Sequence, residues 1–157
     1  MNIIFLDIDG VLNNWEEAKE HYTKTKKTYF GYDWPFSKKS MKVLRKLIKE
    51  SNSNIVLSSS WRNSKKGRKI FKKALKKYHI EDKLIGYTEY LNGQRELEIQ
   101  KYLDNLNEKV NFIILDDENH FNKLEKNLVL VDSFYGFEEK DVEKALTLFK
   151  VQKKGKL

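Results

Sequence analysis

Five short apolar runs, separated by longer polar segments, constrain the fold of this chain more than any other feature. The runs occupy residues 3–6, 55–57, 84–87, 112–115 and 128–131. Each is rich in β-branched or aromatic residues, which is typical of strands buried on both faces of a parallel sheet. The sequence therefore predicts a parallel sheet of about five strands.

The segments between these runs carry the spacing of amphipathic helices, and Ser37 is placed to cap the first of them. The residues expected to face the sheet are Met41, Leu44, Leu47 and Ile48; then Ile70, Phe71, Ala74, Leu75 and Tyr78; then Ile99, Leu103 and Leu106, in a helix starting near Arg95; and finally Val142, Ala145, Leu146 and Phe149, in a helix starting near Glu138. Alternating strands and helices predict a doubly wound, Rossmann-like α/β fold with helices on both faces of the sheet.

No repeat or low-complexity linker divides the chain, so we expect one domain over residues 1–150. Residues 15–36 break the pattern, and we expect a loop or small hairpin that forms a flap or small insertion. Residues 151–157 should form a flexible basic tail. The aromatic residues of the insertion favour a packed flap over a base-stacking platform; they are Tyr29, Phe30, Tyr32, Trp34 and Phe36.

The composition of the chain excludes some kinds of site and indicates others. The chain has no cysteine, which argues against disulfides and cysteine-bound zinc, and no apolar run approaches the roughly 20 residues of a membrane span. We therefore expect a cytoplasmic protein without membrane association, and the oligomeric state stays open. Residues 34–80 hold 15 lysines and arginines against one acid, Glu50, although the net charge of the whole chain is only +8. This basic segment is either a solvated helical surface or a surface for nucleic acid.

Polar side chains follow the apolar runs at the edge where an open parallel sheet binds ligands. They are Asp7 and Asp9 after the first run, Ser58, Ser59 and Ser60 after the second, Arg95 after the third, and Asp116 and Asp117 after the fourth. Two carboxylates about 4 Å apart repel by on the order of 4 kcal/mol at an effective dielectric near 20. Oxygen ligands without His or Cys favour a hard cation, so we expect Mg²⁺ here.

This ordered set of motifs resembles the haloacid dehalogenase (HAD) superfamily of phosphohydrolases. FLDIDGVLN matches its first motif, IVLSS its second, GQRELEIQKYL its third and IILDDE its fourth. SSSWR, R..EI..YL and YGFEEKDVEKAL are more narrowly similar to the small capless HAD domains described in RNA-repair proteins.

The resemblance implies that Asp7 is the nucleophile, which forms an aspartyl-phosphate, and that Asp9 is the general acid and base. It implies a Mg²⁺ site made by Asp7, Asp9 through its main-chain carbonyl, Asp116 and Asp117. It also implies phosphate binding by Ser59, Ser60 and Arg95, with Ser58 in place of Ser59 if the second strand ends one residue earlier.

The absence of a cap domain predicts an open site, and an open site beside the basic segment favours a nucleotide or a terminal phosphate of a nucleic acid as substrate. The alternatives are a phosphatase for proteins or small metabolites, and a phosphate- or nucleic-acid-binding module without catalysis. Trp61 and Arg62 either contact the substrate beyond its phosphate or are a core tryptophan and a surface arginine. His21, His79 and His120 show no metal-ligand spacing.

Overall fold

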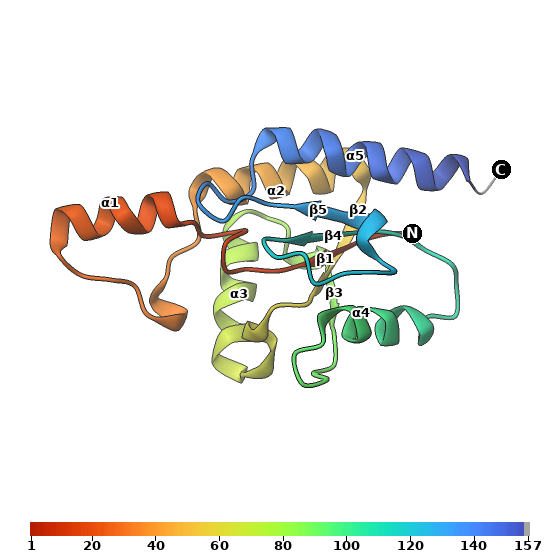
Figure 1. Ribbon diagram of the computed structural model, residues 1–157, viewed down its shortest axis with the longest axis horizontal. Coiled ribbons are helices and arrows are strands. Elements are labelled where there is room, and N and C mark those ends of the chain that lie inside the picture. Colours follow the sequence, from red (N-terminus) through yellow and green to blue (C-terminus); the bar gives the residue numbers. More distant parts are fainter. Residues whose placement is uncertain (156–157) are drawn as a thin grey trace.

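The computed structural model describes residues 1–155 and contains a sheet of five parallel strands. In chain order the strands are β1 (Asn2–Leu6), β2 (Ser53–Leu57), β3 (Leu84–Tyr87), β4 (Asn111–Asp116) and β5 (Leu128–Leu130). Their order across the sheet is β3-β2-β1-β4-β5, so β1 lies at the centre (Figure 1). The predicted doubly wound α/β sheet is confirmed.

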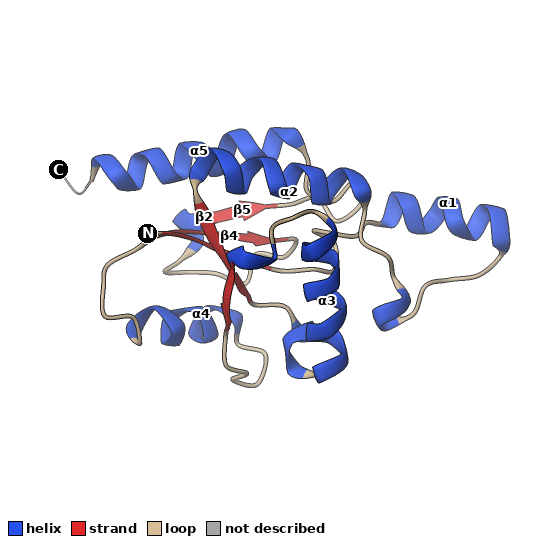
Figure 2. Ribbon diagram, turned by 180° about the vertical axis from the view of Figure 1, so that it is seen from behind, coloured by secondary structure: helices blue, strands red, loops and turns tan. Residues whose placement is uncertain are grey.

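Helices cover both faces of the sheet, as predicted. The four helices that follow the first insertion are α2 (Lys38–Ser51), α3 (Lys65–Lys77), α4 (Arg95–Asp104) and α5 (Glu139–Lys154). One core contains Ile4 and Leu6 of β1 with the apolar faces of α2, α3 and α5, and the other contains Ile3 and Phe5 with the apolar face of α4. Figure 2 shows α4 on the opposite side of the strands from α2 and α5. The alternation of side chains along β1 thus supplies both cores.

The register of the central strands brings their carboxyl ends level with one another. Leu6 of β1 pairs with Leu57 of β2 and with Leu115 of β4. The residues that follow these three leucines therefore meet at one edge of the sheet.

Residues 15–36 differ from the predicted loop or hairpin because they begin with a helix, α1 (Trp15–Thr25). The Asn14 side chain accepts a hydrogen bond from the Glu17 backbone N–H, and Glu16 and Glu17 place negative charge in the first turn, where the helix dipole favours it. α1 buries none of its residues and extends from one end of the molecule (Figure 1). A short 3-10 helix at Gly31–Asp33 follows it and precedes α2.

The predicted flexible tail at residues 151–157 is wrong for its first part, because α5 continues to Lys154. The side-chain oxygen of Gln152 accepts a hydrogen bond from the Phe112 backbone N–H at 2.9 Å, and its amide donates to the Phe112 carbonyl at 2.8 Å. These bonds fasten the end of α5 to β4. Residues 156–157 lie outside the described part of the chain. Within that part, none of the helices has the length and apolar character that crossing a membrane requires.

Candidate active site

Asp7 and Asp116 lie side by side at the carboxyl edge of the sheet because the strand ladder continues past the last leucines. The Asp7 backbone N–H donates to the Leu115 carbonyl at 3.0 Å, and the Ser58 backbone N–H donates to the Leu6 carbonyl at 2.9 Å. Paired residues of parallel strands point to the same face of the sheet. Asp7, Ser58 and Asp116 are therefore placed together, on the face that Phe5 and α4 occupy.

Three carboxylates form a cluster at this edge. One oxygen from each of Asp7, Asp116 and Asp117 lies within 4.8 Å of the other two. Burial, together with repulsion from Asp116 and Asp117, raises the pKa of Asp7 well above its usual range. Burial likewise raises the pKa of Asp116 to about 6 and that of Asp117 in the same direction. The cluster thus holds negative charge that is costly without a counter-ion.

Arg95 supplies part of that counter-charge from the first residue of α4. Its Nη1 lies 2.9 Å from an oxygen of Asp116 and 3.5 Å from an oxygen of Asp7. The guanidinium lowers the pKa of both carboxyls, although burial outweighs it. One guanidinium does not balance the negative charge of three carboxylates, so the cluster can bind a further cation. Because all three side chains offer oxygen ligands, Mg²⁺ fits this site.

Asp9 faces away from this cluster. Its two carboxylate oxygens accept hydrogen bonds from the Asn13 amide at 3.0 Å and from the Trp61 indole N–H at 3.1 Å. The structure therefore brings three of the four predicted carboxylates together as possible metal ligands and holds the carboxylate of Asp9 apart from them. Asn13 and Trp61 are residues that the sequence motifs did not assign to Asp9.

Gly10 explains how the two aspartates diverge. Its φ of +81° is in the left-handed region, which favours glycine, and its N–H donates to the Asn13 side-chain oxygen at 2.9 Å. A Cβ at this position would lie 2.3 Å from an oxygen of Asp117. The turn therefore needs glycine both for its backbone angle and for the close approach of that carboxylate.

The three serines after β2 have different surroundings. The Ser58 hydroxyl is buried and has no hydrogen-bond partner among the described residues. The Ser59 hydroxyl accepts from the Trp61 backbone N–H at 3.2 Å and so caps the 3-10 helix Ser60–Asn63. Ser60 is exposed. Because β2 ends at Leu57, the condition under which Ser58 replaces Ser59 is met.

Arg62 is fully buried, so its interpretation as a surface arginine is wrong, whereas Trp61 is a core tryptophan. The Arg62 guanidinium donates to the carbonyls of Ser58, Ser59 and Thr88 at 2.7–2.9 Å. Its Nη2 also lies 2.7 Å from the Glu98 carboxylate. Arg62 thus fixes the loop after β2 to α4. No local pattern predicts this pair, because 36 positions separate Arg62 from Glu98.

Two of the histidines named from the sequence, and also Asp132 after β5, lie outside the cluster. His120 is exposed and pairs with Glu118, and His21 stacks on Tyr29. Asp132 accepts a hydrogen bond from the Phe134 backbone N–H at 2.9 Å, as turn-capping aspartates do.

Residues 3–142 match a family model described as the HAD domain in Swiss Army Knife RNA repair proteins. The match covers both aspartate motifs, Arg95 and the strands that place them. Neither the curated proteins nor the solved structures compared with this chain show a match.

Proposed function

Because this chain belongs to the family of HAD domains found in Swiss Army Knife RNA repair proteins, we propose that it is a Mg²⁺-dependent phosphatase that hydrolyses a terminal phosphate of a nucleotide or nucleic acid. The observation that carries the proposal is that the carboxylates of Asp7 and Asp9, both just after the end of β1, have different surroundings. Asp7 lies in a buried cluster suited to a cation and a phosphate, while Asp9 is held outside it by two hydrogen-bond donors. A nucleophile and a separate proton carrier need that arrangement.

In the first half of the reaction, an Asp7 oxygen forms a bond to phosphorus while the bond from phosphorus to the leaving oxygen breaks. Asp9 gives its proton to that leaving oxygen. In the second half, Asp9 takes a proton from water, the water oxygen bonds to phosphorus, and the bond to Asp7 breaks. Inorganic phosphate leaves, and both carboxyls return to their starting states.

Asp7, Asp116 and Asp117 are the side chains that would hold Mg²⁺, and the Asp9 main-chain carbonyl is the further ligand that the superfamily resemblance implies. When bound, the cation offsets the repulsion between the Asp7 carboxylate and the phosphate dianion. The raised pKa values of the three carboxyls fit this assignment, since a site built for a divalent cation is overloaded with negative charge without one.

Arg95 and Ser58 would hold the phosphate oxygens. Arg95 is already within 3.5 Å of the nucleophile. Ser58 is next to Asp7 in the sheet register, and its hydroxyl has no hydrogen-bond partner within residues 1–155. We therefore favour Ser58 over Ser59 for this role. Ser60 is exposed, so we favour the buried Ser58 over it as well.

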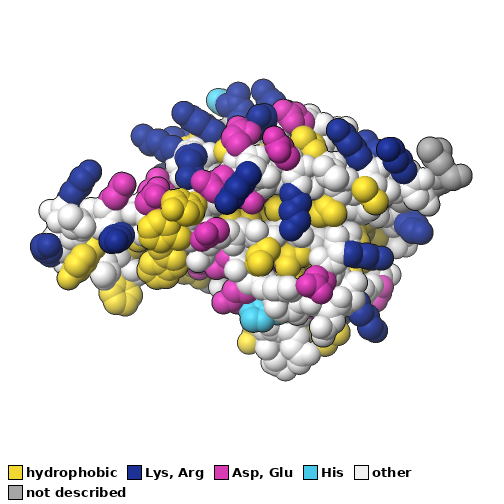
Figure 3. Space-filling model, turned by 45° about the horizontal axis from the view of Figure 1, so that its top comes forward, with side chains coloured by type: hydrophobic (Ala, Val, Ile, Leu, Met, Phe, Trp, Pro, Cys, Tyr) yellow, Lys and Arg dark blue, Asp and Glu magenta, His cyan; other side chains and the backbone are white. Residues whose placement is uncertain are grey.

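Two features favour a nucleotide or nucleic-acid substrate. The matched family is one of RNA repair proteins. In addition, basic α3 directly follows the 3-10 helix that carries Trp61, whose indole N–H binds Asp9, and its first turns carry the sequence KKGRK. On the face that Figure 3 shows, lysine and arginine side chains are mixed with acidic ones. A polyanion held at Asp7 can therefore extend along α3.

The test is release of inorganic phosphate from nucleotides, 3′- and 5′-phosphorylated oligonucleotides, sugar phosphates and phosphopeptides, with Mg²⁺ or with EDTA. Wild type should release phosphate only with Mg²⁺, fastest from nucleotides or oligonucleotides, and Asp7→Asn should release none. Asp132→Asn is the matched control because Asp132 is an exposed acid that follows β5 and lies outside the carboxylate cluster. Phosphate release that persists in Asp7→Asn would contradict the mechanism, and a preference for phosphopeptides would contradict the substrate.

A further inference from the structure

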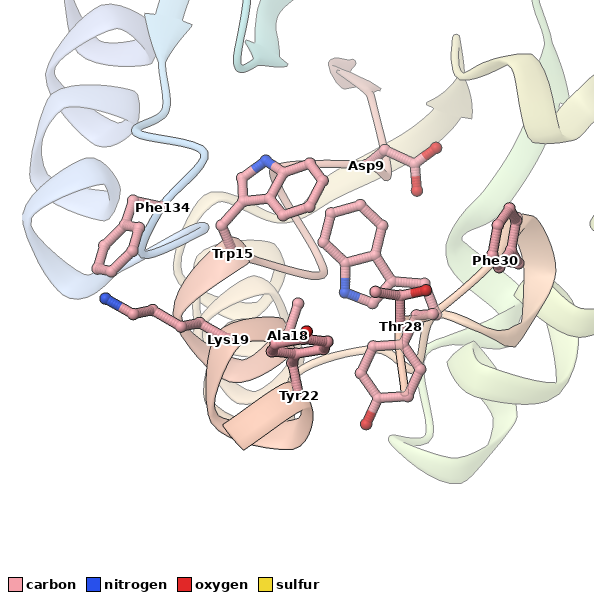
Figure 4. Close-up of a pocket in the computed structure, with 11 residues that line it drawn as sticks. Asp9, Trp15, Ala18, Lys19, Tyr22, Thr28, Phe30 and Phe134 are labelled. Carbon is pink, nitrogen blue, oxygen red and sulfur yellow. The ribbon is translucent and has the colours of Figure 1, made fainter. Parts of the chain in front are cut away.

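Beside Asp9 lies a cavity of about 620 Å³ whose walls are mainly aromatic. Six aromatic side chains line it, together called the aromatic trough here: Trp15, Tyr22, Tyr29, Phe30, Trp34 and Phe134. Asp9 also lines the cavity, so the trough is continuous with the catalytic edge of the sheet. Figure 4 shows Asp9 at one end and Phe30 on the far side of the cavity from Trp15.

The rings of the trough are unusually exposed for a monomeric protein surface. Phe30 is 78% exposed, Trp15 55% and Tyr22 49%. In Figure 3 a broad hydrophobic area lies toward the end of the molecule that carries α1. An exposed apolar patch of this kind, bounded by polar side chains, marks a binding site more often than a packing defect.

The insertion contains two sets of aromatic residues with different surroundings. Tyr32 and Phe36, two of the five aromatic residues that the sequence places in a packed flap, pack against the Trp61 ring, with centroids 4.9 and 5.2 Å away. Trp15 and Trp34 instead pack against each other at 4.8 Å, outside the two cores of the sheet. The first set holds the flap in place, and the second presents ring surface to the cavity.

We propose that the aromatic trough binds the nucleobase of the nucleotide whose phosphate reacts at Asp7. This inference rests on the proposed function and names the recognition element of its substrate. The trough begins at Asp9, which protonates the leaving oxygen, so the group carrying that oxygen must lie toward the trough. In a nucleotide, that group is the sugar, and the base follows it.

A nucleobase fits the trough better than an aliphatic group because the walls offer flat rings. Stacking of a base on an aromatic ring contributes about 1–3 kcal/mol and tolerates any base, since every base has a π-face. The few polar residues in the lining, Asp9, Lys19 and Thr28, are too sparse for recognition of a polar sugar. The cavity volume is within the usual range of roughly 300–1,000 Å³ for small-molecule sites.

The experiment measures binding without turnover, by calorimetry on Asp7→Asn protein with Mg²⁺. The probes are adenosine 3′- and 5′-monophosphate, ribose 5-phosphate and a tryptophan-containing phosphopeptide. At least one of the two adenosine monophosphates should bind about 5- to 150-fold more tightly than ribose 5-phosphate. This range corresponds to the free energy of stacking one base. The same stacking should quench tryptophan fluorescence, because Trp15 and Trp34 line the trough.

Variants of Phe30 separate stacking from general hydrophobicity. Phe30→Ala and Phe30→Leu, each combined with Asp7→Asn, should lose most of the preference for the nucleotide, whereas Phe30→Tyr should keep it because the flat ring remains. Folding is not at risk, because Phe30 is 78% exposed. Val151→Ala is the matched control, since it also removes an exposed apolar side chain, in this case near the end of α5.

Equal affinity for nucleotides and ribose 5-phosphate would overturn the inference, and so would tighter binding of the phosphopeptide. If Phe30→Leu and Phe30→Tyr changed the preference for the nucleotide equally, the stacking role of the Phe30 ring would be overturned. Equal affinities, or equal effects of the variants, leave the proposed hydrolysis intact, because that reaction is tested by Mg²⁺-dependent phosphate release that requires Asp7. Tighter binding of the phosphopeptide would also contradict the proposed substrate, though not the hydrolysis itself. Base-dependent binding by a protein that releases no phosphate would contradict the proposed function and still support the trough as a nucleotide site.

Discussion

The indole of Trp61 gives Asp9 a fixed orientation. Its N–H donates to one Asp9 oxygen at 3.1 Å while the ring itself is buried beneath the insertion. The Asn13 amide binds the other oxygen at 3.0 Å. Together these donors hold the Asp9 carboxyl in one position as it gives up and regains its proton. Trp61 is therefore a positioning residue for the proposed reaction.

Replacing Trp61 by Phe should keep the apolar packing and remove the donor. A hydrogen bond to a charged group contributes about 1.5–3 kcal/mol, so kcat for a nucleotide should fall by about 10-fold or more with little change in KM. The loss should be much smaller for p-nitrophenyl phosphate, whose leaving group needs no proton. A purely structural role would lower both rates alike, and that result would contradict the assignment. Steady-state kinetics on the two substrates make the measurement.

Ser58 and Ser59 offer a second prediction at this scale. Ser58→Ala should lower kcat/KM by about 10-fold or more but leave stability unchanged or slightly higher, because its hydroxyl has no partner among the described residues. Ser59→Ala should lower stability by about 1 kcal/mol through loss of a cap and affect catalysis less. Kinetics and urea unfolding of both variants distinguish them. The reverse pattern would return the phosphate-binding role to Ser59.

Site residues that directly follow a strand can be predicted from the sequence. Site residues that are held by contacts with distant parts of the chain cannot. Asp7 and Asp116 follow apolar strands that end level, so the pattern alone places them together. The contact of Trp61 with Asp9 joins residues 52 positions apart, and nothing in the local sequence indicates it. The same reason explains why neither of the two interpretations of Arg62 from the sequence includes its burial against Glu98.

At the scale of elements, the strands and the helices α2 to α5 were predictable because each buries an apolar face, and burial leaves a period in the sequence. α1 leaves no such signal, since none of its residues is buried. Asn14 and Glu17 cap its start in the structure, a short local pattern that the expected loop or hairpin did not take into account. The end of α5 was missed because Gln152 is fixed by hydrogen bonds to Phe112, a strand residue 40 positions away.

The buried pair of Arg62 and Glu98 joins α4 to the loop after β2, and it yields a stability prediction. Glu98→Ala leaves a buried guanidinium without its carboxylate and should lower the free energy of unfolding by about 3–5 kcal/mol. The matched control is Glu89→Ala, which breaks the exposed pair between Glu89 and Lys101 of the same helix and should cost less than about 1 kcal/mol. Urea unfolding measures both. Equal losses would show that the buried pair has no special role.

At the scale of the whole molecule, the carboxylate cluster couples folding to pH and to metal. Carboxyls whose pKa is raised in the folded protein bind more protons there than in the unfolded chain, whose aspartates titrate near 3.9. The stability they contribute is fully present below about pH 4 and is lost as pH rises through the folded-state values, which include about 6 for Asp116. Metal-free protein should therefore lose stability between about pH 4 and pH 7.

Mg²⁺ should reverse that loss, because it binds the ionised cluster and competes with protons. In EDTA the melting temperature should fall from pH 5 to pH 7.5, and saturating Mg²⁺ should raise it at pH 7.5 much more than at pH 5. For a chain of this length, each kcal/mol of binding shifts the melting temperature by about 2–4 °C. Asp117→Asn removes one carboxylate and should flatten the pH slope in EDTA and shrink the Mg²⁺ shift, which separates the cluster from other titrating groups. Equal Mg²⁺ shifts at both pH values, or in both proteins, would contradict a metal site at these three aspartates, since a cation bound elsewhere has no reason to follow their protonation.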